Sequence, residues 1–415
     1  MDTSQTVTPP GSRFERDPSA VAAVRQRNLA QVLRVVHRLR NSTRSDIARI
    51  TGLSRPAVTS LVAELGGLGF LTDTDRFVSA GRGRPRMGVA MERRTHSVVA
   101  VDLRVDRTVV EVVDLCGDVL QHRHVPVHDS ADADAFVATL AATVRRLSAK
   151  AGVPVVGIGI AAPSYLGADG QPVVSSPYLT LSGTPLAGAL SSALGATSLP
   201  VRMADVAQCA AIANSHALSS PVSGLLAHVQ IGAGAGLGIA GMDGLRPSER
   251  NARVRIGHLP LDPDGPLCTC GARGCLDAVA GFPAFVELTR SLSVGSTPSI
   301  ATMGDYCRDV SELALAGDRV AGDAIRNVAT WAGRGAACVL NLIDPDRLTL
   351  GGYPLYLGEL YRRSFLDAMG PYAPRADETV TAAALGDDAP ALGAAILAMQ
   401  PALDDPLQHP GVDSF

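Results

Sequence analysis

The chain has 415 residues, of which 46% are hydrophobic and 19% charged, so it has room for two or three domains with large cores. This composition excludes a mainly disordered protein, and the absence of a Gly-X-Y or heptad repeat excludes a fibrous one. No apolar run reaches the roughly 18 residues of a membrane-spanning helix. Residues 1–20 lack the apolar segment of a secretion signal. We therefore expect a cytoplasmic protein without a membrane partner.

The net charge of −3 conceals a polarised distribution. Residues 1–94 contain 16 arginines and 8 acidic residues, a balance of +8, whereas the remainder has a balance of −11. A basic N-terminal part on an acidic body indicates that the N-terminal part binds a polyanion and that the body does not.

The N-terminal part predicts three helices after a disordered segment at residues 1–19, which is rich in Pro and Gly. A helical period of apolar residues begins at residue 20. A second helix follows Thr43, with Asp46 as its capping-box partner, and ends at Gly52. Ser54 is the N-cap of a third helix, after which an extended hairpin begins. This order predicts a winged helix-turn-helix over residues 20–80.

In that geometry the third helix enters the major groove of double-stranded operator DNA. The residues that we expect to contact DNA lie on and beside this helix: Arg44, Ser54, Arg55, Ala57, Thr59 and Ser60. An ordinary three-helix cap without DNA contacts is the alternative.

Residues 81–95 are predicted to form a basic linker. It begins with Gly81-Arg82-Gly83-Arg84-Pro85-Arg86. Arginines in a narrow Gly/Pro string suit the strong negative potential of an A·T-rich minor groove, so we expect Arg82, Arg84 and Arg86 to bind there. The alternative is a linker that contacts only phosphates.

The rest of the chain has the pattern of an α/β protein. A strand meander is predicted over 97–128 and a helix over about 132–151. Continuous apolar runs predict buried strands at 155–160, 226–231 and 347–350. Alternating helices and strands indicate two lobes with a cleft between them. We place this body at residues 96–401, followed by a loose tail at 402–415.

Three of the seven cysteines lie close together, at Cys268, Cys270 and Cys275, and His258 precedes them. Three thiolates and one imidazole form a closed tetrahedral site, and thiolate ligands select zinc over magnesium or calcium. We therefore predict one structural Zn²⁺ per chain. The alternative is a set of unrelated thiols.

These motifs resemble the ROK family (repressor, open reading frame, kinase), specifically its transcriptional regulators of the N-acetylglucosamine and xylose repressor type. The resemblance covers about residues 22–400. It rests mainly on Gly257-His258 and on the segment from Cys268 to Asp277, which is similar to the metal motif of the family. It implies a two-lobed, actin-like sugar-kinase fold behind the winged helix-turn-helix, and a homodimer or homotetramer.

The family's kinases carry an Asp-x-Gly-Gly-Thr-Lys loop that binds phosphate, and this chain departs from it. The corresponding segment reads Asp102-Leu103-Arg104-Val105-Asp106. A phosphate cradle needs close backbone approach and no added negative charge, so we expect no ATP binding and no kinase activity. The second glycine loop, Gly232 to Gly236, keeps its glycines but has Ala233 where the family has Thr.

The sugar-binding positions are also altered. The resemblance implies effector contacts at Asp205, Arg255, His258 and Asp277. Arg255 replaces a Glu of the family, and a guanidinium suits phosphate or carboxylate. The alternatives left open are that Asp205 caps a helix and that Arg255 pairs with Asp205 or Asp277.

These inferences together predict a repressor of carbohydrate-related genes that is controlled by a sugar, a phosphosugar or a sugar acid in the cleft. Two alternatives stay open. One is a sugar kinase with a DNA-binding head, and the other is a constitutive regulator with a vestigial cleft.

Overall fold

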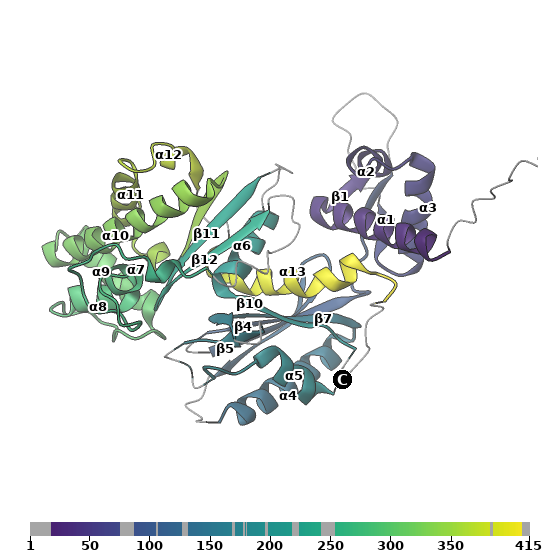
Figure 1. Cartoon of the computed structure of the whole chain (residues 1–415). Helices are drawn as coiled ribbons and strands as arrows, with labels where there is room; N and C mark the ends of the chain where they lie inside the picture. The colour runs from purple at the N-terminus through teal and green to yellow at the C-terminus, as the bar shows by residue number, and fades with distance from the viewer. Residues whose placement is uncertain are drawn as a thin grey trace, which may run out of the picture.

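The structure is a computed structural model of the whole chain, and its N-terminal head stands beside a body of two lobes (Figure 1). The structure describes residues 18–74, 87–104, 107–126, 132–167, 171–176, 179, 181–195, 198–217, 224–241, 254–381 and 385–408.

The head contains three helices and a three-stranded antiparallel sheet. The helices are α1 (Pro18–Leu39), α2 (Arg44–Thr51) and α3 (Arg55–Gly67). The sheet has the order β1 (Asn41–Thr43), β3 (Gly88–Met91), β2 (Leu71–Thr74). The predicted caps are present. Thr43 and Asp46 form a capping box, Gly52 ends α2 with φ of 72°, and the Ser54 hydroxyl accepts from the backbone N–H of Ala57.

Strand β3 corrects the predicted linker at residues 81–95. This strand lies inside that range and pairs with both β1 and β2. Val89 and Met91 are buried in the head, and this burial supplies the free energy that draws the segment into the sheet. Residues 75–86 lie outside the described part of the chain.

The first lobe of the body is built on a five-stranded mixed sheet with the order β10-β7-β4-β5-β6. Its strands are β4 (Ser97–Leu103), β5 (Arg107–Asp114), β6 (Val119–Pro126), β7 (Val155–Ala162) and β10 (Val201–Asp205). Helices α4 (Ala133–Ala151) and α5 (Leu186–Leu194) cover one face (Figure 1). Beside it, β8 (Ser164–Leu166) and β9 (Pro172–Val174) form a short antiparallel pair.

The second lobe is built on a four-stranded sheet with the order β12-β11-β13-β14. Its strands are β11 (Leu225–Ile231), β12 (Ala235–Gly241), β13 (Arg347–Gly352) and β14 (Val380–Thr381). Its helices are α7 (Leu276–Ala280), α8 (Phe282–Thr289), α9 (Met303–Leu315), α10 (Arg319–Ile343), α11 (Gly358–Met369) and α12 (Ala376–Thr379). Among the described residues, no helix combines the length and the apolar character of a membrane span.

Two helices, α6 (Val206–Ala217) and α13 (Ala389–Asp404), lie between the two sheets (Figure 1). Glycines in the strands allow these two helices to approach the sheets closely. A Cβ on Gly159 of β7 would lie 1.9 Å from the Ala394 carbonyl oxygen of α13. A Cβ on Gly238 of β12 would lie 2.0 Å from the Ala207 carbonyl oxygen of α6. Backbone contact of this kind seats both helices rigidly on the sheets.

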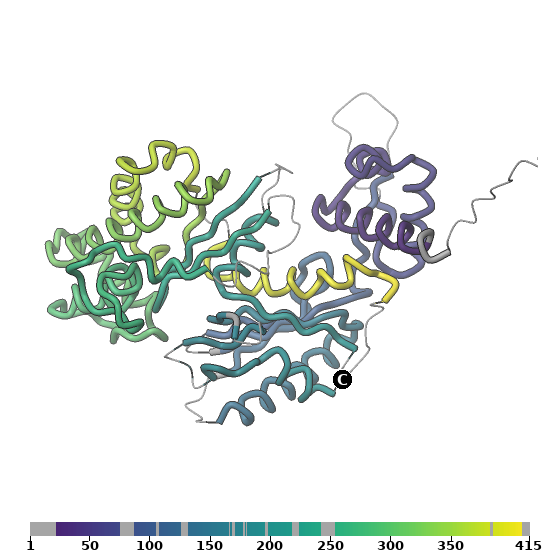
Figure 2. Tube along the Cα trace, viewed as in Figure 1, coloured from purple at the N-terminus to yellow at the C-terminus, as the bar shows by residue number. Residues whose placement is uncertain are grey.

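Helix α13 corrects the predicted loose tail at residues 402–415. It continues to Asp404, and Ala402 and Leu403 are buried. Figure 2 shows its C-terminal end beside the head. There Arg34 Nε of α1 donates to Asp404 Oδ1 at 2.8 Å, and Gln26 of α1 donates to Asp405. The two apolar side chains and these polar contacts order the segment. Residues 409–415 lie outside the described part.

The head also contacts α6. His37 Nδ1 of α1 lies 3.3 Å from His216 Nε2. Burial lowers the pKa of His37 to about 3 and that of His216 to about 4. Both imidazoles are therefore neutral at pH 7, so one can donate to the other. Buried residues of the head and of the first lobe form one continuous hydrophobic cluster.

Candidate metal centre and interlobe cleft

The four predicted metal ligands come together in the second lobe. The ligand atoms of His258, Cys268, Cys270 and Cys275 all lie within 4.8 Å of one another. His258 Nδ1 lies 3.7 Å from Cys268 Sγ, and Cys270 Sγ lies 3.7 Å from Cys275 Sγ. Sulfur ligands bound at about 2.3 Å in a tetrahedral zinc site stand about 3.8 Å apart, so this donor set fits Zn²⁺.

The loop that carries the cysteines is shaped by two glycines with positive φ. Gly271 has φ of 91° and follows Cys270, and the backbone N–H of Cys268 donates to the Ala272 carbonyl at 2.7 Å. Gly274 has φ of 60°, and a Cβ there would lie 1.5 Å from the Asp262 carbonyl oxygen. Only glycine fits this close approach. The loop therefore holds the thiols around one point.

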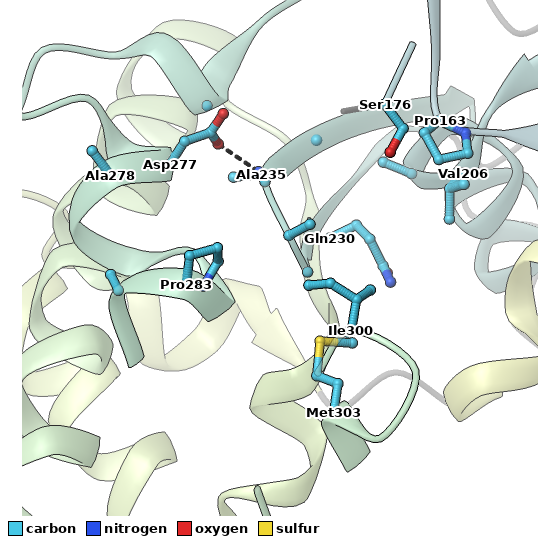
Figure 3. A pocket seen from close by; sticks show the side chains of 18 of the residues that line it. Pro163, Ser176, Val206, Gln230, Ala235, Asp277, Ala278, Pro283, Ile300 and Met303 are labelled. Carbon is cyan, nitrogen blue, oxygen red and sulfur yellow. Dashed lines mark hydrogen bonds between the residues drawn. The ribbon is translucent and has the colours of Figure 1, made fainter. Parts of the chain in front are cut away.

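Asp277 links this loop to the glycine loop of the cleft. Its Oδ1 accepts the backbone N–H of Ala235 at 2.6 Å (Figure 3), and its Oδ2 lies 3.9 Å from His258 Nδ1. A Cβ on Gly257 would lie 2.2 Å from the same carboxylate. Burial raises the pKa of Asp277, whereas the Ala235 hydrogen bond and His258 lower it. The Asp277 carboxylate thus links the glycine loop at Ala235 with the segment that carries His258.

A cleft of about 1350 Å³ separates the lobes, and it is lined by residues from both. All four predicted effector residues line it: Asp205, Arg255, His258 and Asp277. Figure 3 shows this pocket from close by, where Ser176 and Pro163 of the first lobe and Val206 of α6 face Gln230, Ile300 and Met303 of the second lobe. The cleft is large enough for a ligand of sugar or nucleotide size.

Asp205 ends β10 and precedes α6. Its Oδ1 accepts the backbone N–H of Ala207 at 2.8 Å, and its Oδ2 accepts the backbone N–H of Ser164 at 3.3 Å. The carboxylate therefore caps α6, as one of the two predicted roles requires, and it also lines the cleft. Burial raises the pKa of Asp205 to about 6, and the backbone hydrogen bonds oppose the rise.

Arg255 precedes the short helix η2 (Ile256–His258) and is exposed in the cleft. Its guanidinium carbon lies 5.0 Å from the centre of the Tyr165 ring. Within the described part of the chain it forms no ion pair with Asp205 or Asp277, contrary to the alternative that the sequence left open. Stacking on an aromatic face leaves the donors at the guanidinium edge available to an anion.

Arg104 directly follows β4, in the segment that corresponds to the first phosphate loop of the family's kinases but lacks its glycines. Arg104 Nε donates to Oδ2 of buried Asp102 at 2.8 Å, and Arg104 Nη2 donates to the Asp387 carbonyl at 2.8 Å. Asp387 lies in η4 (Gly386–Asp388) and accepts from the Tyr356 hydroxyl of η3 (Tyr353–Tyr356). These contacts join the first lobe to the second across the cleft. Residues 105 and 106 lie outside the described part.

The head presents most of its predicted DNA-binding side chains to solvent. The N-cap Ser54 and Arg55, Thr59 and Ser60 of α3 are exposed, and Ala57 is half-buried. Arg44 forms an ion pair with Asp73 of β2 at 2.8 Å. Three further predicted residues lie outside the described part: Arg82, Arg84 and Arg86.

Two residues of the cleft were not predicted from the sequence. Tyr165 lies in strand β8 and stacks on Arg255, and no local motif marks it. Gln230 lies next to the end of β11 and lines the cleft. The available signal was a polar residue in an otherwise buried strand, two positions before Gly232.

Comparison with known proteins identifies the family of the body. The sequence model described as "ROK family" matches residues 98–401, which is most of the chain. The chain belongs to the ROK family. It is 24% identical over 355 residues to the DNA-binding transcriptional repressor Mlc of Escherichia coli K12, a match that covers 81% of this chain and 83% of that protein. It is 30% identical over 319 residues to a glucokinase of Streptomyces coelicolor, covering 73% and 98%.

A solved structure supports the same architecture. The crystal structure of a ROK family transcriptional regulator, described as a homologue of E. coli MLC, superposes with a TM-score of 0.72 at 22% identity. It covers 93% of this chain and 98% of its own. The glucokinase match leaves about a quarter of this ROK protein uncovered, whereas the regulator structure extends over nearly the whole chain.

Proposed function

We propose that this ROK protein is a DNA-binding transcriptional repressor of carbohydrate-related genes, controlled by a small molecule in the interlobe cleft. The observation that carries the proposal is the head: Ser54 caps α3, and Arg55, Thr59 and Ser60 are exposed on that helix. Helix α2, Gly52 and α3 together with the β2–β3 pair support a winged helix-turn-helix whose third helix enters the major groove.

Kinase activity is disfavoured by two contacts in the cleft. The Arg104 guanidinium donates a hydrogen bond to the Asp102 carboxylate, in the loop where the family's kinases have glycines. In the second glycine loop, the backbone N–H of Ala235 is already donated to Asp277, and that carboxylate adds negative charge beside the loop. Phosphoryl transfer depends on donors that stabilise the phosphates, so a sugar kinase with a DNA-binding head is the weaker candidate.

The effector that we propose carries an anionic group, as in a phosphosugar or a sugar acid. Arg255 is exposed in the cleft, its ring partner Tyr165 is uncharged, and within the described part of the chain no carboxylate forms an ion pair with it. Asp205 and the outer nitrogen of His258 offer partners for hydroxyl groups. Zinc bound by His258 and the three cysteines would hold that imidazole in place.

We further propose that the protein acts as a homodimer or homotetramer, because two heads on a symmetric dimer match an inverted repeat in operator DNA. An effector that binds one body state more tightly changes DNA affinity by the difference, typically about 1–3 kcal/mol. The contacts of α1 with α13 and α6 provide a rigid connection between body and head.

Fluorescence anisotropy with a duplex from the protein's own promoter region tests this function. Wild-type protein should bind an inverted repeat, and the logarithm of its affinity should fall linearly with the logarithm of salt concentration. Arg55→Ala should weaken binding by about 1–3 kcal/mol. Arg319→Ala, an exposed arginine of the body, is the matched control and should bind as the wild type does. Equal affinities of the wild type and Arg55→Ala would refute the DNA-binding role of α3.

A further inference from the structure

A row of three polar side chains leads from the interior of the second lobe to the cleft. His228 Nδ1 lies 2.9 Å from Thr349 Oγ1, and His228 Nε2 lies 3.0 Å from Gln230 Oε1. His228 pairs in register with Thr349 across β11 and β13, and Gln230 pairs with Gly351. Side chains two residues apart share a face of a strand, so the row follows one face of the sheet. His228 and Thr349 are buried, whereas Gln230 is half-buried and lines the cleft.

The protons in this row have one consistent arrangement. Burial lowers the pKa of His228 to about 4, so its ring is neutral at pH 7 and has one donor and one acceptor nitrogen. With Gln230 Oε1 facing Nε2 of His228, that nitrogen carries the proton and Nδ1 accepts from the Thr349 hydroxyl, which lies 2.9 Å from Nδ1 and 3.4 Å from the Ala227 carbonyl oxygen. Nε2–H of His228 then donates to Gln230 Oε1. The amide nitrogen of Gln230 is left for the pocket, where Figure 3 draws it at the tip of the side chain.

Gly351 leaves the space that this row occupies. A Cβ at residue 351 would lie 2.2 Å from Gln230 Oε1 and 2.6 Å from His228 Nε2. Any other residue would force the two side chains apart, because real Cβ atoms do not approach so closely. The absence of a side chain at residue 351 therefore leaves room for the Gln230 amide beside His228.

We propose that Gln230 is a ligand-binding residue of the cleft, which donates its amide hydrogens to an anionic oxygen of the effector. His228 and Thr349 act as positioning residues that prevent the amide from turning over. The proposal rests on the proposed role of the cleft as an effector site. Gln230 and Arg255 then offer only donors, and a carboxylate or phosphate only accepts, so charge-assisted hydrogen bonds select such a group over a hydroxyl.

Isothermal titration of the full-length protein with glucose, gluconate and glucose 6-phosphate tests the proposal. The wild type should bind at least one of the two anions more tightly than glucose, and their comparison separates carboxylate from phosphate. Gln230→Met, which keeps the volume but loses the donor, should lower the affinity for that anion about tenfold. Gln230→Glu should lower it further by repulsion. Gln121→Glu on β6, outside the cleft, is the control for added charge and should change nothing.

Thr349→Val tests the positioning role separately. It removes the hydroxyl that holds His228, so the preference for the anion over glucose should shrink while glucose affinity and melting temperature stay close to the wild type. Thr349→Ser should restore the preference.

Three results would overturn the proposal: unchanged anion affinity in Gln230→Met, tighter binding of glucose than of either anion, or no anion binding at millimolar concentration. Anisotropy with operator DNA on the same samples reports the proposed regulatory function independently of these titrations.

Discussion

The carboxylate of Asp277 accepts the backbone N–H of Ala235 at 2.6 Å and thereby joins the metal loop to the glycine loop of the cleft. Asp277 follows Cys275 by two residues, so its place depends on the loop that the thiols hold. The same contact occupies one backbone N–H of the glycine loop. One short carboxylate therefore connects the cysteine-bearing loop with the shape of the cleft.

The first prediction concerns the metal. Purified protein should contain about one zinc per chain, and Cys270→Ser should lower the zinc content and destabilise the second lobe, because structural zinc contributes folding free energy directly. Cys338→Ser on α10 lies outside the cluster and is the control. Zinc analysis and thermal unfolding measure both effects. Full zinc content in Cys270→Ser would mean that the ligand set is different.

The second prediction concerns phosphoryl transfer. With ATP and glucose, N-acetylglucosamine or xylose, we expect no phosphorylated product above background. Arg104 fills the first loop beside Asp102, and Asp277 accepts the backbone N–H of Ala235 in the Gly232–Gly236 loop. A coupled assay for ADP release measures this. Sugar-dependent turnover that disappears in Asp205→Ala would establish the kinase alternative instead.

The third prediction concerns the pH dependence of stability. The pKa of Asp205 in the folded protein is about 6, above its ordinary value near 3.8, because burial disfavours the charged form. Its contribution to stability is therefore fully present below pH 3.8 and is lost as the pH rises to about 6. The loss is about 2–3 kcal/mol. Asp205→Asn cannot titrate, so the stability of the wild type relative to this variant should fall across that interval.

Urea unfolding of both proteins between pH 4 and 7 measures this difference, as estimated from the linear extrapolation of the unfolding free energy. All other titratable groups are the same in the two proteins, so the difference isolates Asp205. A constant difference across this interval would contradict the raised pKa.

The fourth prediction concerns the seating of α13 on the first sheet. Gly159→Ala would place a methyl group 1.9 Å from the Ala394 carbonyl oxygen, so it should destabilise the body by about 1–3 kcal/mol or more. Gly188→Ala in α5 meets no atom within 4 Å and should stabilise by up to about 1 kcal/mol, because alanine is the better helix former. Thermal unfolding of the two variants should show shifts of opposite sign. A small effect of Gly159→Ala would show that α13 can move away from the sheet.

Local sequence patterns determined much of this protein. Some features depend only on residues a few positions apart, so they can be recognised from the sequence alone. They are the capping box of Thr43 and Asp46, the end of α2 at Gly52 and the spacing of the three cysteines. The buried strands can also be recognised from the sequence, because their apolar runs are continuous.

Tertiary structure decided the features that join distant segments. The pairing of β3 with both β1 and β2, and the contact of α13 with the head, depend on residues far apart in the chain, so neither the predicted linker nor the predicted tail revealed them. The stacking of Arg255 on Tyr165 has the same origin. The surroundings of Gln230 are set by Thr349 and Gly351, on a strand more than a hundred residues away. A side chain's orientation follows from the atoms packed against it, and only the folded chain brings those atoms together.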